Sequence, residues 1–209
     1  MDFYSIHCVP AREAFSIFPK ELLREVTRVA FTGTRINGLS AGVANIVTAS
    51  LRCTLSGKNY KISVGDASGV DAEVREELWQ QPHEIFKVTG TERKDFAQRS
   101  VRCVQSVLPA EGAVLLAFPD KRCPAKVNTK PRFAGHGSGT WGTVGYALAH
   151  HIDVIMYVPP QVDPVKWCGP LKKYATKVTG PGTDRNTPAD NGSWLKLSLP
   201  PAAKQPTLF

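Results

Sequence analysis

Short apolar runs alternate with amphipathic segments along most of this chain, and this alternation constrains the fold more than any other feature of the sequence. Five of the apolar runs are typical of buried strands, at 28–31, 61–64, 84–88, 113–118 and 153–158. The segments between them with helical spacing lie at 39–55, 70–79, 95–108 and 140–150. Strands that alternate with helices build a parallel sheet covered on both faces. The sequence therefore predicts an α/β protein with a Rossmann-like parallel sheet and helices on both of its faces.

The same pattern divides the chain into three parts. Residues 28–178 carry the strand and helix signals, and residues 1–27 form an N-terminal extension. Residues 179–209 are rich in Gly, Pro, Asn and Asp, which predicts a flexible tail. Within the central part, the polar insert at 119–137 is expected to lack regular structure.

Composition limits the kinds of partner. The chain has 26 Lys and Arg against 18 Asp and Glu, and a net charge of +8 favours polyanions such as nucleic acid. Its five cysteines are scattered without a C-x-x-C pair, so we expect neither a disulfide framework nor a metal site. Neither a membrane span nor a signal peptide is evident, which predicts a cytoplasmic protein.

Two glycine turns follow the first two predicted strands. Parallel sheets bind ligands at the carboxyl ends of their strands, which is where these turns lie. The first turn offers Gly33, Thr34 and Arg35 to a phosphate, although an ordinary strand-to-loop turn explains it equally well. The second turn opens a helix, whose dipole favours an anion. Ser68 or Asp66 can instead simply cap that helix. The candidate phosphate-binding residues of the second turn are Gly65, Asp66, Ser68, Gly69 and Asp71.

A third turn precedes the helix at 140–150 and is the densest in glycine. Its candidate phosphate-binding residues are Gly137, Ser138, Gly139 and Thr140. Neither a P-loop nor a G-x-G-x-x-G after the first strand is present, so we expect neither P-loop hydrolysis nor a dinucleotide cofactor. The insert before this turn, at 119–137, is strongly basic. It is either an arm that contacts nucleic acid or a solvated loop. Its candidate residues are Lys121, Arg122, Lys126, Lys130 and Arg132.

The order of these segments resembles the SLOG superfamily, which includes the DNA-processing protein A (Smf) family and the LONELY GUY phosphoribohydrolases. The resemblance lies in RVAFTGTR at 28–35, VGDASGVDAEV at 64–74, RSVRCV at 99–104, LLAFP at 115–119 and GSGTWGTVGYALAHHIDVIMYVP at 137–159. It implies a Rossmann-like domain with a nucleotide or nucleic-acid pocket over the glycine turns, and dimers are common among such proteins. It also implies a pocket arginine, either Arg99 or Arg102.

The two families imply different activities. LONELY GUY enzymes use a glutamate where this chain has Thr143, so Asp66 or Asp71 would have to replace it in glycosidic-bond hydrolysis. The DNA-processing family binds single-stranded DNA through basic residues around the pocket, a role that the basic insert suits. Whether the chain is an enzyme stays open at this point.

The chain ends in Gln205-Pro-Thr-Leu208-Phe209, which resembles the peptide that docks bacterial replication proteins on the sliding clamp. Gln205, Leu208 and Phe209 would bind the partner from a flexible tether, or the segment is an ordinary C-terminus. The sequence favours a protein of DNA metabolism that binds a nucleotide or single-stranded DNA. A nucleoside monophosphate hydrolase and a ligand-sensing adaptor are the alternatives.

Overall fold

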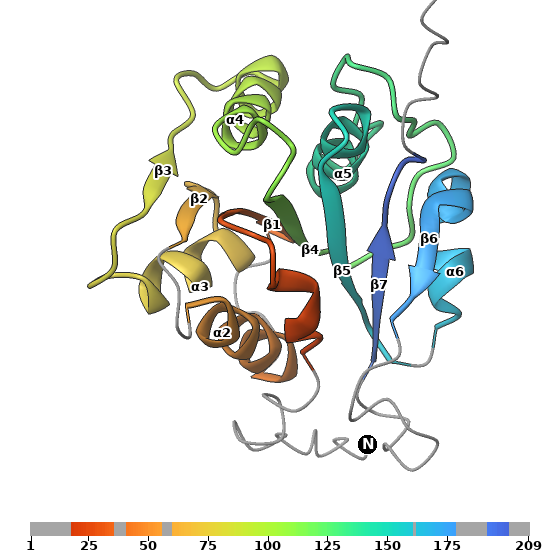
Figure 1. Cartoon of the computed structure of the whole chain (residues 1–209). Helices are drawn as coiled ribbons and strands as arrows, with labels where there is room; N and C mark the ends of the chain where they lie inside the picture. Colours follow the sequence, from red (N-terminus) through yellow and green to blue (C-terminus); the bar gives the residue numbers. More distant parts are fainter. Residues whose placement is uncertain (1–17, 36–40, 56–59, 161, 179–191, 201–209) are drawn as a thin grey trace, which may run out of the picture.

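A mostly parallel sheet forms the centre of the protein in the computed structural model, which describes residues 18–35, 41–55, 60–160, 162–178 and 192–200 (Figure 1). The described residues form seven strands in the order β3-β2-β1-β4-β5-β7-β6. Strands β3 to β5 in this order are parallel, and β7 is antiparallel to both β5 and β6. The strands are β1 Arg28–Gly33, β2 Lys61–Gly65, β3 Glu84–Phe86, β4 Ala113–Phe118, β5 Asp153–Val158, β6 Ala175–Lys177 and β7 Ser193–Leu197. The predicted α/β Rossmann-like fold is confirmed.

Helices cover both faces of this sheet. Successive residues of a strand point to opposite faces, so each face has its own apolar core. Val114 and Leu116 of β4 pack in the core beneath α2 and α3, whereas Leu115 and Ala117 pack beneath α4 and α5. Every residue of β4 is buried, as its unbroken apolar run predicts. The helices are α2 Ala41–Leu55, α3 Val70–Glu77, α4 Arg93–Gln105, α5 Gly139–Ala149 and α6 Pro164–Trp167, with 3₁₀ turns η1 Lys20–Leu23 and η2 Gly169–Tyr174.

The strand order places a crevice at one end of the sheet. Strand β1 lies between β2 and β4, and the chain leaves β1 for α2 on one face but leaves β4 for α5 on the other. Ligands of open α/β sheets bind at such a switch point, outside the carboxyl ends of the strands. The fold therefore predicts a ligand site at the turns that follow Gly33 and Phe118.

Part of the predicted flexible tail belongs to the sheet. Ser193–Leu197 forms β7, which lies between β5 and β6, and Trp194 is only 2% exposed. Its indole lies 5.1 Å from the Phe18 ring and 5.4 Å from the Tyr157 ring, measured between centroids. The prediction missed β7 because five residues flanked by a polar, glycine-rich stretch give a weak strand signal. The predicted N-terminal extension also reaches the core, through Phe18, Leu23 and Val26.

The described part of the chain contains no helix with the length and apolarity that crossing a membrane requires.

Replacing the β7 tryptophan tests whether this strand is integral to the fold. Trp194→Ala should lower the free energy of unfolding by about 3–5 kcal/mol, because it empties a large buried site. Trp79, which is 76% exposed, supplies the matched control, and Trp79→Ala should cost less than about 0.5 kcal/mol. Urea unfolding of both variants measures the difference, and equal losses would contradict the place of β7 in the core.

Candidate functional site

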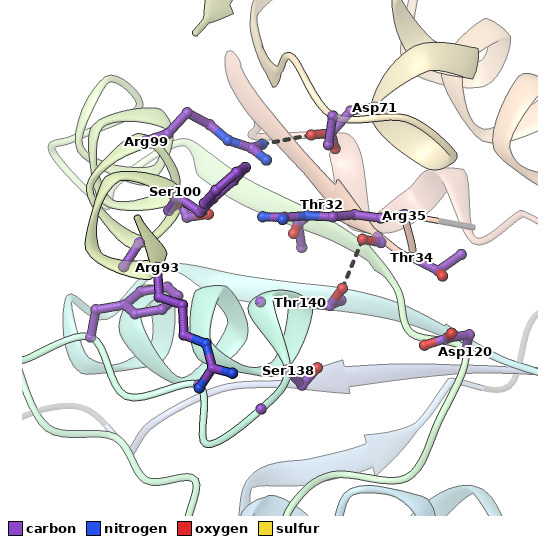
Figure 2. Close-up of a pocket in the computed structure, with 18 of the residues that line it drawn as sticks. Thr32, Thr34, Arg35, Asp71, Arg93, Arg99, Ser100, Asp120, Ser138 and Thr140 are labelled. Carbon is purple, nitrogen blue, oxygen red and sulfur yellow. Dashed lines mark hydrogen bonds and ion pairs between the residues drawn. The ribbon is translucent and has the colours of Figure 1, made fainter. Parts of the chain in front are cut away.

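A cavity of about 690 Å³ opens at the switch point, between the end of β1, α4 and the turn before α5 (Figure 2). Three segments distant in sequence contribute most of its lining, at 32–35, 93–100 and 133–140, and they include residues of the first and third predicted glycine turns. Ala67 and Asp71 of the second turn, with Asp120 and Lys121, complete the lining. The lining residues are Thr32, Gly33, Thr34, Arg35, Ala67, Asp71, Arg93, Phe96, Ala97, Arg99, Ser100, Asp120, Lys121, Phe133, Gly135, His136, Gly137, Ser138, Gly139 and Thr140.

The N-terminus of α5 forms one wall of the cavity. Ser138 caps this helix, since its hydroxyl accepts the Trp141 N–H at 3.3 Å. Thr140 donates its hydroxyl hydrogen to the carbonyl of Gly33 at 2.8 Å, which ties the turn to the end of β1. The N–H groups of Gly139 and Thr140 have no acceptor among the described residues. These first-turn donors, with the positive end of the helix dipole, provide an anion-binding geometry.

Gly139 and Gly142 are glycines for different reasons. A Cβ on Gly142 would press against the Phe133 ring and the backbone of Gly135, so this glycine serves packing. A Cβ on Gly139 would meet only the end of the Arg35 side chain, at 3.7 Å. Internal packing thus accounts for Gly142 but leaves Gly139 as an open part of the cavity wall.

The first turn brings Arg35 into the cavity. Its guanidinium carbon lies 4.7 Å from the centroid of the Phe96 ring, a cation–π contact. Burial lowers the pKa of Arg35, and the nearby positive charge of Arg99 lowers it further. Gly33 also lines the cavity, but a Cβ there would overlap Val70, so packing against α3 suffices to explain this glycine.

The second turn shapes the cavity but contributes little of its surface. Asp71 lines the cavity, whereas Gly65, Asp66, Ser68 and Gly69 do not. The Ser68 hydroxyl donates to the Arg35 carbonyl at 2.7 Å, and Asp66 accepts the Val88 N–H at 2.7 Å.

The start of α3 lacks the side-chain cap that the sequence offered as an alternative to a phosphate site. The helix N-cap is Gly69, so neither Ser68 nor Asp66 caps the helix. The Val70 N–H donates to the Thr34 carbonyl at 3.1 Å, which occupies one donor of this helix end. The second turn therefore positions Arg35 and Asp71 through contacts within the protein.

A buried ion pair closes the inner end of the cavity. Arg99 Nη1 lies 2.6 Å from Asp71 Oδ2, and the two residues are 6% and 4% exposed. Burial raises the pKa of Asp71, and the Arg99 charge opposes that rise. Arg99 Nε lies 3.6 Å from Asp66 Oδ1 and has no hydrogen-bond acceptor among the described residues. Figure 2 shows the pair meeting above the Arg35 side chain.

Gly65 makes this ion pair possible. It is the last residue of β2, and a Cβ there would overlap the Arg99 guanidinium and Asp71 Oδ2. Arg75 fixes the following turn by donating to the carbonyls of Gly65 at 2.6 Å and Ala67 at 3.1 Å. Of the two arginines that the sequence left open, Arg99 lines the cavity, whereas Arg102 donates to the Lys87 carbonyl and lies outside it.

One face of α4 supplies cavity residues that the sequence analysis did not identify. Arg93, Phe96, Ala97 and Ser100 follow the i, i+3, i+4, i+7 spacing of a single helix face. That spacing was a usable signal, but the face is not apolar and no glycine turn marks it. In Figure 2, Arg93 extends from α4 into the cavity on the side of Ser138.

The basic insert is irregular, as predicted, but it is anchored to the domain. Cys123 and Val127 are buried, and the Lys121 carbonyl accepts the Trp141 indole N–H at 2.7 Å. Lys121 lines the cavity and donates to the Gly137 carbonyl at 3.3 Å. The other four candidate residues are exposed and lie outside the cavity: Arg122, Lys126, Lys130 and Arg132.

The carboxylates at the cavity are Asp71, which Arg99 holds, and Asp120, which is exposed. Thr143 is buried and donates its hydroxyl hydrogen to the Gly139 carbonyl at 2.9 Å. The candidate partner-binding residues Gln205, Leu208 and Phe209 lie outside the described residues. In comparisons with protein-family models, curated proteins and solved structures, no match was found for this chain.

The ion pair can be tested by unfolding two matched variants. Asp71→Leu should lower the free energy of unfolding by about 3–5 kcal/mol, because it removes the hydrogen-bonded carboxylate of the buried Arg99 and leaves only the more distant Asp66. Adding Arg99→Met should recover part of that loss, since both charges are then absent. Urea unfolding gives the two values, and a double variant less stable than Asp71→Leu alone would contradict a charge-driven coupling.

Proposed function

We propose that this chain binds a nucleotide, either free or as part of single-stranded DNA, by holding its phosphate at the N-terminus of α5. The N–H groups of Gly139 and Thr140, which lack an acceptor in the described part of the chain, carry this proposal, because both residues line a cavity that arginine side chains also enter. Backbone amides at a helix N-terminus and guanidinium groups are the usual ligands of phosphate in proteins. The SLOG resemblance of the sequence supports the same reading.

The charge balance of the cavity supports an anionic ligand. Asp71 neutralises Arg99, which leaves Arg35, Arg93 and Lys121 against the single carboxylate of Asp120 among the lining residues. Arg35 is partly desolvated and close enough to Arg99 for the second charge to lower its pKa. A bound phosphate would relieve this repulsion and supply the acceptors that a desolvated guanidinium lacks.

The size and lining of the cavity suit a nucleotide. Its volume lies within the range of about 300–1,000 Å³ that is usual for small-molecule sites. Phe96 and Phe133 line the same cavity as the cationic groups, and the Arg35 guanidinium lies over the Phe96 ring. Aromatic rings accept any base by stacking, which suits a site without strong base preference.

The role in DNA metabolism and the recruitment to a sliding clamp are the wider parts of this proposal. They rest on the sequence resemblance and on the C-terminal Gln205-Pro-Thr-Leu208-Phe209. Hydrolysis of the glycosidic bond is less well supported, because of the two acids suggested by the sequence, Asp66 lies outside the cavity and Asp71 is engaged by Arg99.

Neutral replacement of the two cavity arginines tests the phosphate site. Arg35→Gln and Arg93→Gln should each weaken nucleoside monophosphate binding about tenfold or more, because each removes a charge-assisted hydrogen bond. Isothermal titration with a nucleoside monophosphate and with the matching nucleoside measures this loss. The nucleoside itself should bind weakly and with little change between variants.

The control is Arg52→Gln on α2, where the exposed arginine pairs with Glu77 away from the cavity. It changes the net charge equally and should leave affinity unaltered. Equal losses in all three variants, or nucleoside binding as tight as that of the monophosphate, would contradict a phosphate-directed cavity.

Gly139→Ala separates ligand binding from folding. The added methyl group would meet only the Arg35 side chain, so the urea midpoint should stay close to that of the unaltered protein. The same methyl group would narrow the approach of a phosphate to the α5 amides and should reduce monophosphate affinity. Unchanged affinity in this variant would show that phosphate does not contact this turn.

A further inference from the structure

Positive charge gathers on the part of the chain that follows β4. Residues 119–178 contain nine Lys and Arg against three Asp and no Glu, an excess that makes this stretch the main source of the net charge. Only Lys121 of these cations lines the cavity. The other cations lie on the insert, on α6, on η2 and on the edge strand β6. A ligand held in the cavity does not explain their presence.

The insert physically joins the cavity to the α6–η2 segment. Near its two ends, Lys121 and Phe133 line the cavity. Between them, the Cys123 N–H donates to the Trp167 carbonyl at 2.9 Å, and Thr129 and Tyr174 share a hydrogen bond between hydroxyls at 3.5 Å. Figure 1 shows the insert passing from the end of β4 beside α6 and β6 before it returns to α5.

The η2 lysines beside this path form no salt bridge with a carboxylate in the part of the chain that the structure describes. Lys172 and Lys173 are exposed on η2, and Lys173 Nζ lies 4.9 Å from the centroid of the Tyr174 ring. Among the described residues, salt bridges on this side of the molecule engage Lys166 and Lys196, but none engages the exposed insert cations or the two η2 lysines. Neighbouring cations without carboxylates create a positive field that attracts a polyanion.

We propose that this basic surface, formed by Lys126, Lys130 and Arg132 of the insert with Lys172 and Lys173 of η2, binds the backbone of a single-stranded nucleic acid whose terminal or flanking nucleotide occupies the cavity. The inference rests on the proposed function, and it adds a second, sequence-independent contact region to it. Stacking in a cavity combined with a charged path for the backbone is how proteins bind single strands without reading their sequence.

A nucleic acid fits this surface better than an anionic membrane does. Attachment to a membrane surface is strongest where a buried apolar face adds to the attraction between cations and anionic lipids. Among the described residues around the lysines, the large apolar side chain that is clearly exposed is Val165, at 41%.

The test compares ligands of increasing length with the variant Lys172→Gln/Lys173→Gln. Binding of an oligothymidylate of about 20 nucleotides should weaken about tenfold near 0.1 M salt, because two phosphate contacts are lost. The slope of log affinity against log salt should fall by about 1.4, since each contact to a single strand contributes roughly 0.7. Thymidine monophosphate should bind the variant and the unaltered protein equally well.

Lys61→Gln/Lys87→Gln is the control, because it removes the same charge at the other side of the sheet, where Lys61 begins β2 and pairs with Glu84 and Lys87 follows the edge strand β3. An equal loss of oligothymidylate affinity in both double variants would overturn the proposal in favour of a general charge effect. Unchanged oligonucleotide binding with lost binding to phosphatidylserine vesicles would overturn it in favour of a membrane. Loss of monophosphate binding in Arg35→Gln is independent of these outcomes and tests the cavity alone.

Discussion

The buried ion pair between Arg99 and Asp71 holds the two helical layers together at the end of the sheet where the cavity lies. Asp71 belongs to α3 on one face of the sheet and Arg99 to α4 on the other, and they meet beyond the last residue of β2. Gly65 permits this meeting because any side chain there would occupy the position of the guanidinium. Since neither charge is tolerated alone in the interior, α3 and α4 are constrained to one relative position.

This constraint determines which charges remain for a ligand. With Arg99 neutralised, Arg35 and Arg93 enter the cavity from opposite walls, and the α5 amides form a third wall. The contacts of Ser68 with the Arg35 carbonyl and of Thr140 with the Gly33 carbonyl hold these walls in register. The site thus combines a rigid frame with a small number of uncompensated positive groups, which is an arrangement suited to an anion.

The sequence predicted the sheet well because buried parallel strands such as β4 and β5 are continuous apolar runs. It also located the α5 turn, where dense glycine precedes a helix. It did not separate glycines that serve packing, such as Gly33 and Gly65, from Gly139, since that distinction depends on neighbours remote in sequence. Arg93 and Phe96 were missed for the same reason, and β7 because its pairing with β5 and β6 joins segments far apart in the chain.

Amide chemical-shift mapping by NMR gives the most direct test of the central claim that phosphate binds at the N-terminus of α5. On addition of a nucleoside monophosphate, the Gly139 and Thr140 amides and the Arg35 Nε–H should shift, and the matching nucleoside should leave them nearly unchanged. The amides of β3 and α2 should stay constant in both titrations. Saturating shifts confined to residues outside the cavity, or equal shifts with nucleoside and monophosphate, would contradict the account.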